Sequence, residues 1–108
     1  MIEIRISDCC VIAKGHAGFA PEGQDIVCAG VSALLYTAGR YLRAMDQAGK
    51  LRTAPTVRLS PGDVKLEAKP KAVNSRECET VFRFLELGLT EIAGKYPGYI
   101  SIHAARFA

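Results

Sequence analysis

Residues 25–49 read DIVCAGVSALLYTAGRYLRAMDQAG, and their apolar side chains recur at steps of three and four residues. This spacing predicts an amphipathic helix, because positions three and four apart lie on one helical face. Asp25 precedes the run and is a preferred N-cap, since its carboxylate can accept the unpaired N–H groups of the first turn. Gly49 is expected to end the helix. The apolar positions are Val27, Val31, Leu34, Leu35, Ala38, Leu42 and Met45.

Two predicted hairpins flank this helix. Before it, residues 2–6 alternate isoleucine with polar residues, and residues 9–13 form a second apolar run. Alternation with a period of two is typical of a half-buried strand, so the two segments are expected to pair. After the helix, residues 51–59 and 63–69 are separated by Pro61-Gly62, a strong turn signal that predicts a second hairpin.

A second helix and a final strand complete the predicted order. Asn74 and Glu77 resemble a capping box, and the helical pattern after them ends before Gly94. Residues 99–104 alternate again and predict a strand. The order is therefore ββαββαβ, an α+β sandwich in which two helices cover one face of a mainly antiparallel sheet. Without a linker or an internal repeat, residues 1–108 are expected to form a single domain. The stripe of this second helix comprises Val81, Phe82, Leu85, Leu89 and Ile92.

Composition excludes several classes of protein. A chain of 108 residues with 49% hydrophobic and 23% charged residues can bury one core, which argues against intrinsic disorder. Its net charge of +3 is too small for the dense basic stripe of a nucleic-acid binder, so we expect no direct nucleic-acid partner. The start, MIEIRIS, does not resemble a secretion signal, and no apolar run approaches the roughly 20 residues of a membrane span. Four cysteines without a disulfide-like spacing favour free thiols in the cytoplasm.

Cys28 and His16 are the candidate catalytic pair. Cys28 is expected in the first turn of the long helix, where unpaired N–H groups and the helix dipole favour the negatively charged thiolate. His16 lies twelve residues earlier, in the glycine-rich segment 14–24, which is predicted to be a mobile loop leading into that turn. We therefore hypothesise a Cys-His dyad in which His16 accepts the thiol proton and the thiolate attacks a carbonyl carbon.

Ser32, Gly15 and Asp25 are candidate supporting residues, and ordinary structural roles are the alternative for Ser32 and Asp25. Ser32 lies one helical turn after Cys28 and can bond the thiolate or orient a peptide, but a helical serine also often bonds back to the preceding turn. Gly15 precedes His16 and suits a loop that opens and closes. Asp25 can simply cap the helix.

Gly30 either admits a substrate backbone or reflects close helix packing. Cys28 itself can be a small buried hydrophobe, which is the simplest interpretation of Cys9, Cys10 and Cys78.

Metal and redox sites fit the sequence less well. Zinc ligands usually come in close pairs such as C-x₂-C or H-x₃-H, and the four cysteines and two histidines form no such pair, so we expect no metal. A thiol-redox enzyme would be expected to carry a C-x-x-C motif, which is also missing from the sequence. His103 alternates with Ser101 and Tyr99 on a strand and is interpreted as a surface residue, or as a second residue lining the cleft.

The segments Gly15-His16-Ala17 and DIVCAGVSA at residues 25–33 together resemble the ribosomal-processing cysteine protease family, Prp. The resemblance implies Cys28 as nucleophile and His16 as general base and later acid. It implies mobility at Gly15 and gives Asp25 and Ser32 as the remaining polar positions of the motif. It further implies a homodimer that needs no metal or organic cofactor. The implied substrate is the N-terminal extension of a large-subunit ribosomal protein precursor, cut after a Phe-rich motif.

Two details of this mechanism are also predicted. The backbone N–H of Cys28 is the expected donor to the oxyanion, and Phe19 and Tyr36 are candidates for an apolar pocket that takes a substrate phenylalanine. The alternatives are a non-catalytic protein-binding module of the same fold, a protease acting on a phage-related protein, and an RNA-binding protein, which the modest charge disfavours.

Overall fold

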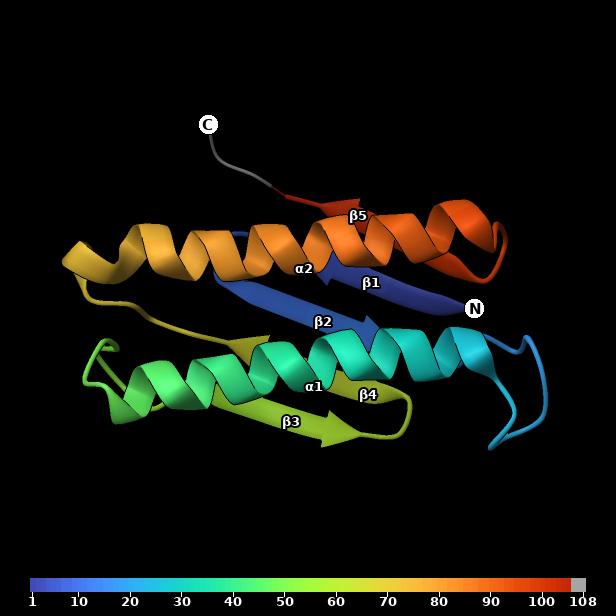
Figure 1. The fold of residues 1–108 in the computed structure, drawn as a ribbon, viewed down its shortest axis with the longest axis horizontal. Coiled ribbons are helices and arrows are strands. Elements are labelled where there is room, and N and C mark those ends of the chain that lie inside the picture. The colour runs from blue at the N-terminus through green and yellow to red at the C-terminus, as the bar shows by residue number, and fades with distance from the viewer. Residues whose placement is uncertain (106–108) are drawn as a thin grey trace.

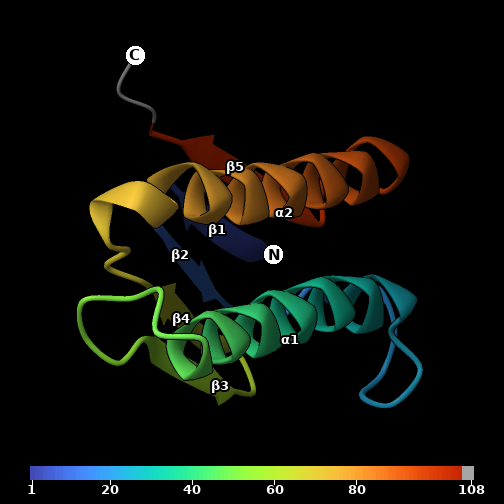
Figure 2. The same ribbon diagram turned by 60° about the vertical axis from the view of Figure 1, so that its left-hand side comes forward.

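One five-stranded sheet and two long antiparallel helices make up the fold, with both helices on the same face of the sheet (Figures 1 and 2). The structure is a computed structural model and describes residues 1–105; residues 106–108 of the predicted domain lie outside the described residues. The predicted ββαββαβ order and the α+β class are confirmed. In chain order, the elements are β1 (Ile2–Ile6), β2 (Cys10–Lys14), α1 (Ile26–Gln47), β3 (Thr56–Ser60), β4 (Asp63–Glu67), the short 3₁₀ turn η1 (Ala72–Asn74), α2 (Ser75–Lys95) and β5 (Ile100–Ala104).

The strands follow the order β3-β4-β2-β1-β5, which makes β2 the central strand. Both predicted hairpins form: Ile4 is opposite Ala13 in the first, and Val57 is opposite Leu66 in the second. The two hairpins join because β2 also pairs with β4. β5 is parallel to β1, since the chain crosses over through α2 before it returns to the sheet. The sheet is therefore mainly antiparallel, as predicted.

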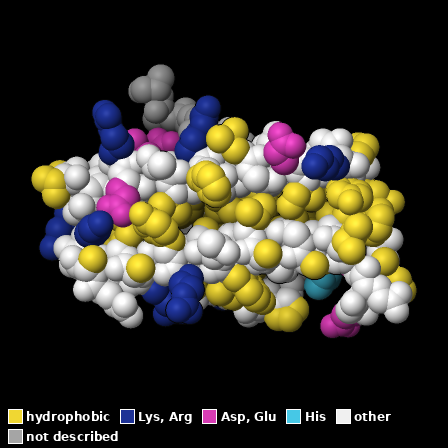
Figure 3. Space-filling model, viewed as in Figure 1, with side chains coloured by type: hydrophobic (Ala, Val, Ile, Leu, Met, Phe, Trp, Pro, Cys, Tyr) yellow, Lys and Arg dark blue, Asp and Glu magenta, His cyan; other side chains and the backbone are white. Residues whose placement is uncertain are grey.

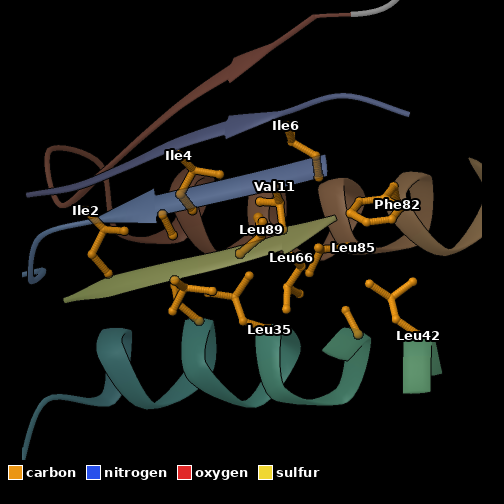
Figure 4. Packing of buried hydrophobic residues seen from close by; sticks show 14 of the residues in the cluster. Ile2, Ile4, Ile6, Val11, Leu35, Leu42, Leu66, Phe82, Leu85 and Leu89 are labelled. Carbon is orange, nitrogen blue, oxygen red and sulfur yellow. The ribbon is translucent and has the colours of Figure 1, made fainter. Parts of the chain in front are cut away.

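The core lies between the sheet and the helices (Figure 4). Alternation along β1 directs its isoleucines toward the helices, and the three- and four-residue spacing of α1 and α2 directs their aliphatic side chains back. Burying each large apolar side chain contributes about 1.5–3 kcal/mol to stability. The largest fully buried residues are Phe82, Ile4, Leu42, Met45, Leu66, Leu89, Val11, Val27 and Cys78.

The two helices pack closely against each other at two glycines. A Cβ atom at Gly88 would lie 3.0 Å from a methyl group of Leu34, and one at Gly30 would lie 3.2 Å from a methyl group of Ile92. Gly30 therefore serves close helix packing, the structural alternative considered for it. Figure 3 shows hydrophobic side chains along the seam between the helices.

The helix ends differ from one another. At the end of α1, Gly49 adopts a φ of +72°. Its N–H donates to the Asp46 carbonyl, and the N–H of Lys50 donates to the Met45 carbonyl, both at 3.0 Å. This is the Schellman arrangement, so the predicted stop is confirmed.

The capping box predicted at α2 is wrong: the Asn74 side chain makes no capping hydrogen bond, and Glu77 binds Lys50 and Tyr41 instead. Long-range partners draw that carboxylate away from its own helix end.

The predicted strand over residues 51–59 is shorter than expected. Leu51 makes one isolated bridge to Pro70, and regular pairing begins only at Thr56. Pro55 has no N–H with which to continue the ladder, which explains the late start. Among the described residues, neither helix is long and apolar enough to cross a membrane.

Candidate active site

An open cleft of about 860 Å³ lies where the start of α1 meets the loop over residues 15–25 and the β3–β4 turn. The turn contributes residues 60–63 to the lining, and the first turns of α1 contribute residues between positions 26 and 36. The candidate catalytic pair and the three candidate supporting residues all line this cleft, although they come from the loop and from the helix. They are Gly15, His16, Asp25, Cys28 and Ser32.

Asp25 joins the loop to the helix. One carboxylate oxygen accepts the N–H groups of Val27 and Cys28 at 3.0 Å, which confirms the predicted N-cap. The other oxygen accepts the N–H groups of Phe19 and Ala20 at 3.0 and 3.4 Å. These backbone donors, with that of Cys28 contributing most, lower the pKa of Asp25 below its usual value. A single carboxylate thus organises both sides of the helix start.

The thiol of Cys28 is half-buried, and a loop residue donates to it. The backbone N–H of Ala17 lies 3.3 Å from Cys28 Sγ, and Ala17 itself is buried. This backbone donor is in place to bond the sulfur once the thiol proton has left. The contact brings the residue next to His16 onto the sulfur, so the loop folds back over the helix start.

His16 is exposed in the cleft and lies against the β3–β4 turn. A Cβ atom at Gly62 would lie 2.7 Å from His16 Nε2, so the imidazole occupies the space beside that glycine. The N–H of Gly15 donates to the Gly62 carbonyl at 2.9 Å, which ties the residue before His16 to the same turn. The imidazole therefore faces the cleft with the backbone on both sides of it fixed.

The expected oxyanion donor is wrong in this arrangement. The N–H of Cys28 already donates to the Asp25 carboxylate, and the N–H of Ala29 donates to the Asp25 carbonyl at 3.0 Å. Capping therefore uses the donor that the mechanism assigned to the oxyanion.

The predicted apolar pocket also needs correction. Phe19 is absent from the cleft lining and packs edge-on against Tyr96 and Tyr99, with ring centroids 5.3 and 5.2 Å apart. Tyr36 does line the cleft and is about half exposed. Ser32 is exposed on the same helix, one turn after Cys28. Phe19 thus packs the loop against the C-terminal end of α2 and does not line the cleft.

The other cysteines and the second histidine lie outside the cleft lining. Cys78 is fully buried, and burial raises its pKa to about 12; it is a core residue, as expected. Cys9 and Cys10 are half-buried, and desolvation raises the pKa of each. His103 is exposed on the face of the sheet that the helices leave open, 3.2 Å from Ser101 Oγ, so it is a surface residue. Within residues 1–105, no three His, Cys, Asp or Glu side chains gather as a metal-ligand set.

A profile of the family described as "Cysteine protease Prp" matches residues 1–101. The chain belongs to this Prp family. Ribosomal processing cysteine protease Prp of Mycoplasma genitalium is 29% identical over 104 residues, which are 95% of this chain and 95% of that protein. The expectation of a cysteine protease, and so of an enzyme, is therefore confirmed.

Solved Prp structures share the fold. The essential ribosomal processing protease Prp from S. aureus, in complex with a covalently linked product peptide, matches with a TM-score of 0.76 at 25% identity, over 97% of this chain and 100% of that chain. The same protease in complex with a substrate peptide matches with a TM-score of 0.70 at 24% identity, over the same shares.

Two contributors to the site could not be found from the sequence. The Ala17 N–H lies within the Gly-His-Ala segment, but backbone donors have no side-chain signature. Gly62 was visible only as part of a turn signal, 46 residues after His16. Their contacts arise from the pairing of β2 with β4, which places the start of the loop beside the β3–β4 turn.

Proposed function

We propose that this Prp-family protease removes the N-terminal extension of a large-subunit ribosomal protein precursor, with Cys28 as nucleophile and His16 as general base and acid. The observation that carries the proposal is the 3.3 Å hydrogen bond from the Ala17 N–H to Cys28 Sγ, in a cleft that His16 also lines. The names of the Mycoplasma genitalium and S. aureus proteases, which both refer to ribosomal processing, support the substrate class.

The chemistry proceeds through an acyl-enzyme. His16 accepts the thiol proton, and Cys28 Sγ attacks the scissile carbonyl carbon to form a tetrahedral intermediate. The C–N bond then breaks as His16 returns the proton to the leaving amine, which leaves a thioester on Cys28. His16 next deprotonates a water molecule that hydrolyses the thioester, releasing the acid and restoring the thiol. The covalently linked product peptide of the S. aureus protease supports covalent catalysis.

The supporting residues have different roles in this proposal. Asp25 fixes the loop on the helix start through its four backbone donors. Gly15 adopts a φ of +93°, which favours glycine, and so sets the direction in which the chain enters the loop. Ser32, exposed one turn from Cys28, orients the bound peptide.

The protease is proposed to act in the cytoplasm as a homodimer. Four free cysteines suit a reducing compartment. Phe84 and Leu87, about one helical turn apart on the outer side of α2, are 74% and 54% exposed and offer apolar area for a second copy. Sedimentation equilibrium tests the dimer, and a monomer at every concentration would contradict it.

A cleavage assay on the ribosomal protein precursor of the source organism tests the function. Cys28→Ala and His16→Ala are each expected to lower the cleavage rate by about three orders of magnitude or more, because nucleophile and base act as a unit. Mass spectrometry of the products locates the cut. Cys10→Ala is the matched control, since this cysteine is also half-buried but lies outside the cleft lining, and its activity should equal that of the wild type. Undiminished cutting by Cys28→Ala would contradict the proposal.

A further inference from the structure

The β3–β4 turn is in contact with the catalytic loop although 46 residues of sequence separate Gly62 from His16. The Gly62 carbonyl accepts the Gly15 N–H at 2.9 Å, so the backbone immediately before His16 is bonded to the turn. On its other side, Gly15 lies so close to the N-terminus that a Cβ atom there would be 2.5 Å from the carbonyl oxygen of Met1. The backbone that leads into His16 is therefore held in place at Gly15.

The imidazole itself rests on Gly62. A Cβ atom at Gly62 would lie 2.7, 3.2 and 3.3 Å from His16 Nε2, Cε1 and Cδ2, the three atoms of the outer ring edge. Carbon and nitrogen atoms that are not bonded to each other attract best near 3.5–4.0 Å, so a methyl group there requires the ring to move. The space beside the ring is available only because residue 62 has no side chain.

The β3–β4 turn is connected to both neighbouring strands. Pro61 restricts the backbone before Gly62, and Asp63 after it forms ion pairs with Lys14 of β2 and with Arg58 of β3, the latter at 3.1 Å. These side chains bind the turn to the two strands beside it. A side chain at residue 62 should therefore displace the exposed His16 ring, because the strand pairing on both sides of the turn holds the turn in place.

We propose that Gly62 is a positioning residue: the bare backbone of the β3–β4 turn fixes the place of the His16 imidazole in the cleft that Cys28 also lines. This inference rests on the proposed function of His16. In a catalytic triad a carboxylate orients the histidine. Here the Asp25 carboxylate already accepts four N–H groups, so we assign the orienting role to the backbone at Gly62.

Gly62→Ala tests the proposal, with Gly49→Ala as a matched control. The two glycines have φ values of +70° and +72°, so a methyl group strains both backbones equally, but nothing lies within 4 Å of the Cβ position at Gly49. Both variants should therefore lower Tm through this backbone strain. Only Gly62→Ala should lower kcat, by about ten- to a hundredfold, with a smaller effect on KM and a changed pH profile for iodoacetamide alkylation of Cys28.

Gly62→Asn guards against misfolding, because asparagine tolerates this backbone conformation and still introduces a Cβ atom. It should reproduce the loss of kcat with a smaller loss of Tm. Wild-type kcat and pH profile in Gly62→Ala or Gly62→Asn, or an equal loss of kcat in Gly49→Ala, would overturn the proposal.

The double variant Gly62→Ala/His16→Ala shows whether Gly62 acts through His16. Its residual rate should equal that of His16→Ala alone, because a displaced ring no longer matters once the ring is gone. A further tenfold loss in the double variant would overturn the positioning role. Full activity in His16→Ala would instead refute the proposed function, so the two failures are distinguishable.

Discussion

Cys28 and Cys78 both lie at the start of a long helix, and the antiparallel arrangement of α1 and α2 places them at opposite ends of the molecule (Figure 1). Their surroundings differ. Cys28 is half-buried in an open cleft and accepts a backbone N–H, whereas Cys78 is fully buried beside Cys9, and desolvation raises its pKa to about 12. A helix start favours a thiolate only where the sulfur is also reached by donors and by solvent, so burial outweighs the helix dipole at Cys78.

The N-terminal caps of the two helices also differ. Asp25 accepts two N–H groups of α1 and two of the preceding loop. At α2 the chain enters through η1, the Asn74 side chain makes no capping bond, and the first-turn carboxylate of Glu77 binds Lys50 at 2.9 Å. The start of α1 is thus built around an anionic centre that orders a loop, and the start of α2 around packing.

The largest expected difference between Cys28 and Cys78 is in their rates of alkylation. At pH 8 a thiol with a pKa of about 12 is ionised in only about one molecule in ten thousand, so Cys78 should react with iodoacetamide at least about a hundredfold more slowly than Cys28. Peptide mass spectrometry at successive times measures both rates. In denaturant the difference should disappear, which serves as the control. Equal rates in the native protein would contradict the comparison.

Serine substitution should produce opposite effects at the two positions. Cys78→Ser places a hydroxyl in an apolar core and is expected to lower the free energy of unfolding by about 1–3 kcal/mol, with normal cleavage per folded molecule. Cys28→Ser should change that free energy by no more than about 0.5 kcal/mol while cleavage is lost. Urea denaturation and the cleavage assay measure the two quantities. Loss of activity without loss of stability in Cys78→Ser would refute this assignment of roles.

Substitution of the caps should give the smallest effect. Asp25→Ala removes the acceptor of four N–H groups and should lower Tm by several degrees, whereas Asn74→Ala removes no capping bond and should leave Tm unchanged. Thermal unfolding followed by circular dichroism measures both variants. An equal fall in Tm for the two would show that the Asp25 bonds add nothing.

The sign of the pH dependence follows from the lowered pKa of Asp25. Because the folded value lies below the unfolded one, the stabilisation by this carboxylate is complete above the unfolded pKa and is lost as pH falls through the folded pKa. Asn caps helices nearly as well as Asp and does not titrate. The Tm of Asp25→Asn should therefore fall less than that of the wild type on acidification below about pH 4. Parallel curves would contradict the assignment.

Local patterns were sufficient for most of the fold and for the identity of the candidate pair. The alternation in residues 2–6, the periodicity of residues 25–49 and the Pro61-Gly62 turn each reflect interactions between near neighbours, which the order of residues encodes directly. The same is true of the Asp25 cap and of the Schellman end at Gly49. The errors concern the capping box at Asn74, the pocket role of Phe19, the Cys28 N–H as oxyanion donor and the start of the strand after α1. Distant partners bind the side chains of Glu77 and Phe19 in the first two cases.

The sequence by itself thus determined the elements, their order, and the presence of a cysteine at a helix start after a histidine-bearing loop. Only the tertiary structure decided which cysteine lines an open cleft, where the N–H of Ala17 points, and that Gly62 lies beside the imidazole of His16. The physical reason is that burial and close contact depend on how separate elements pack, here on the pairing of β2 with β4, and such distances are not encoded in any local spacing.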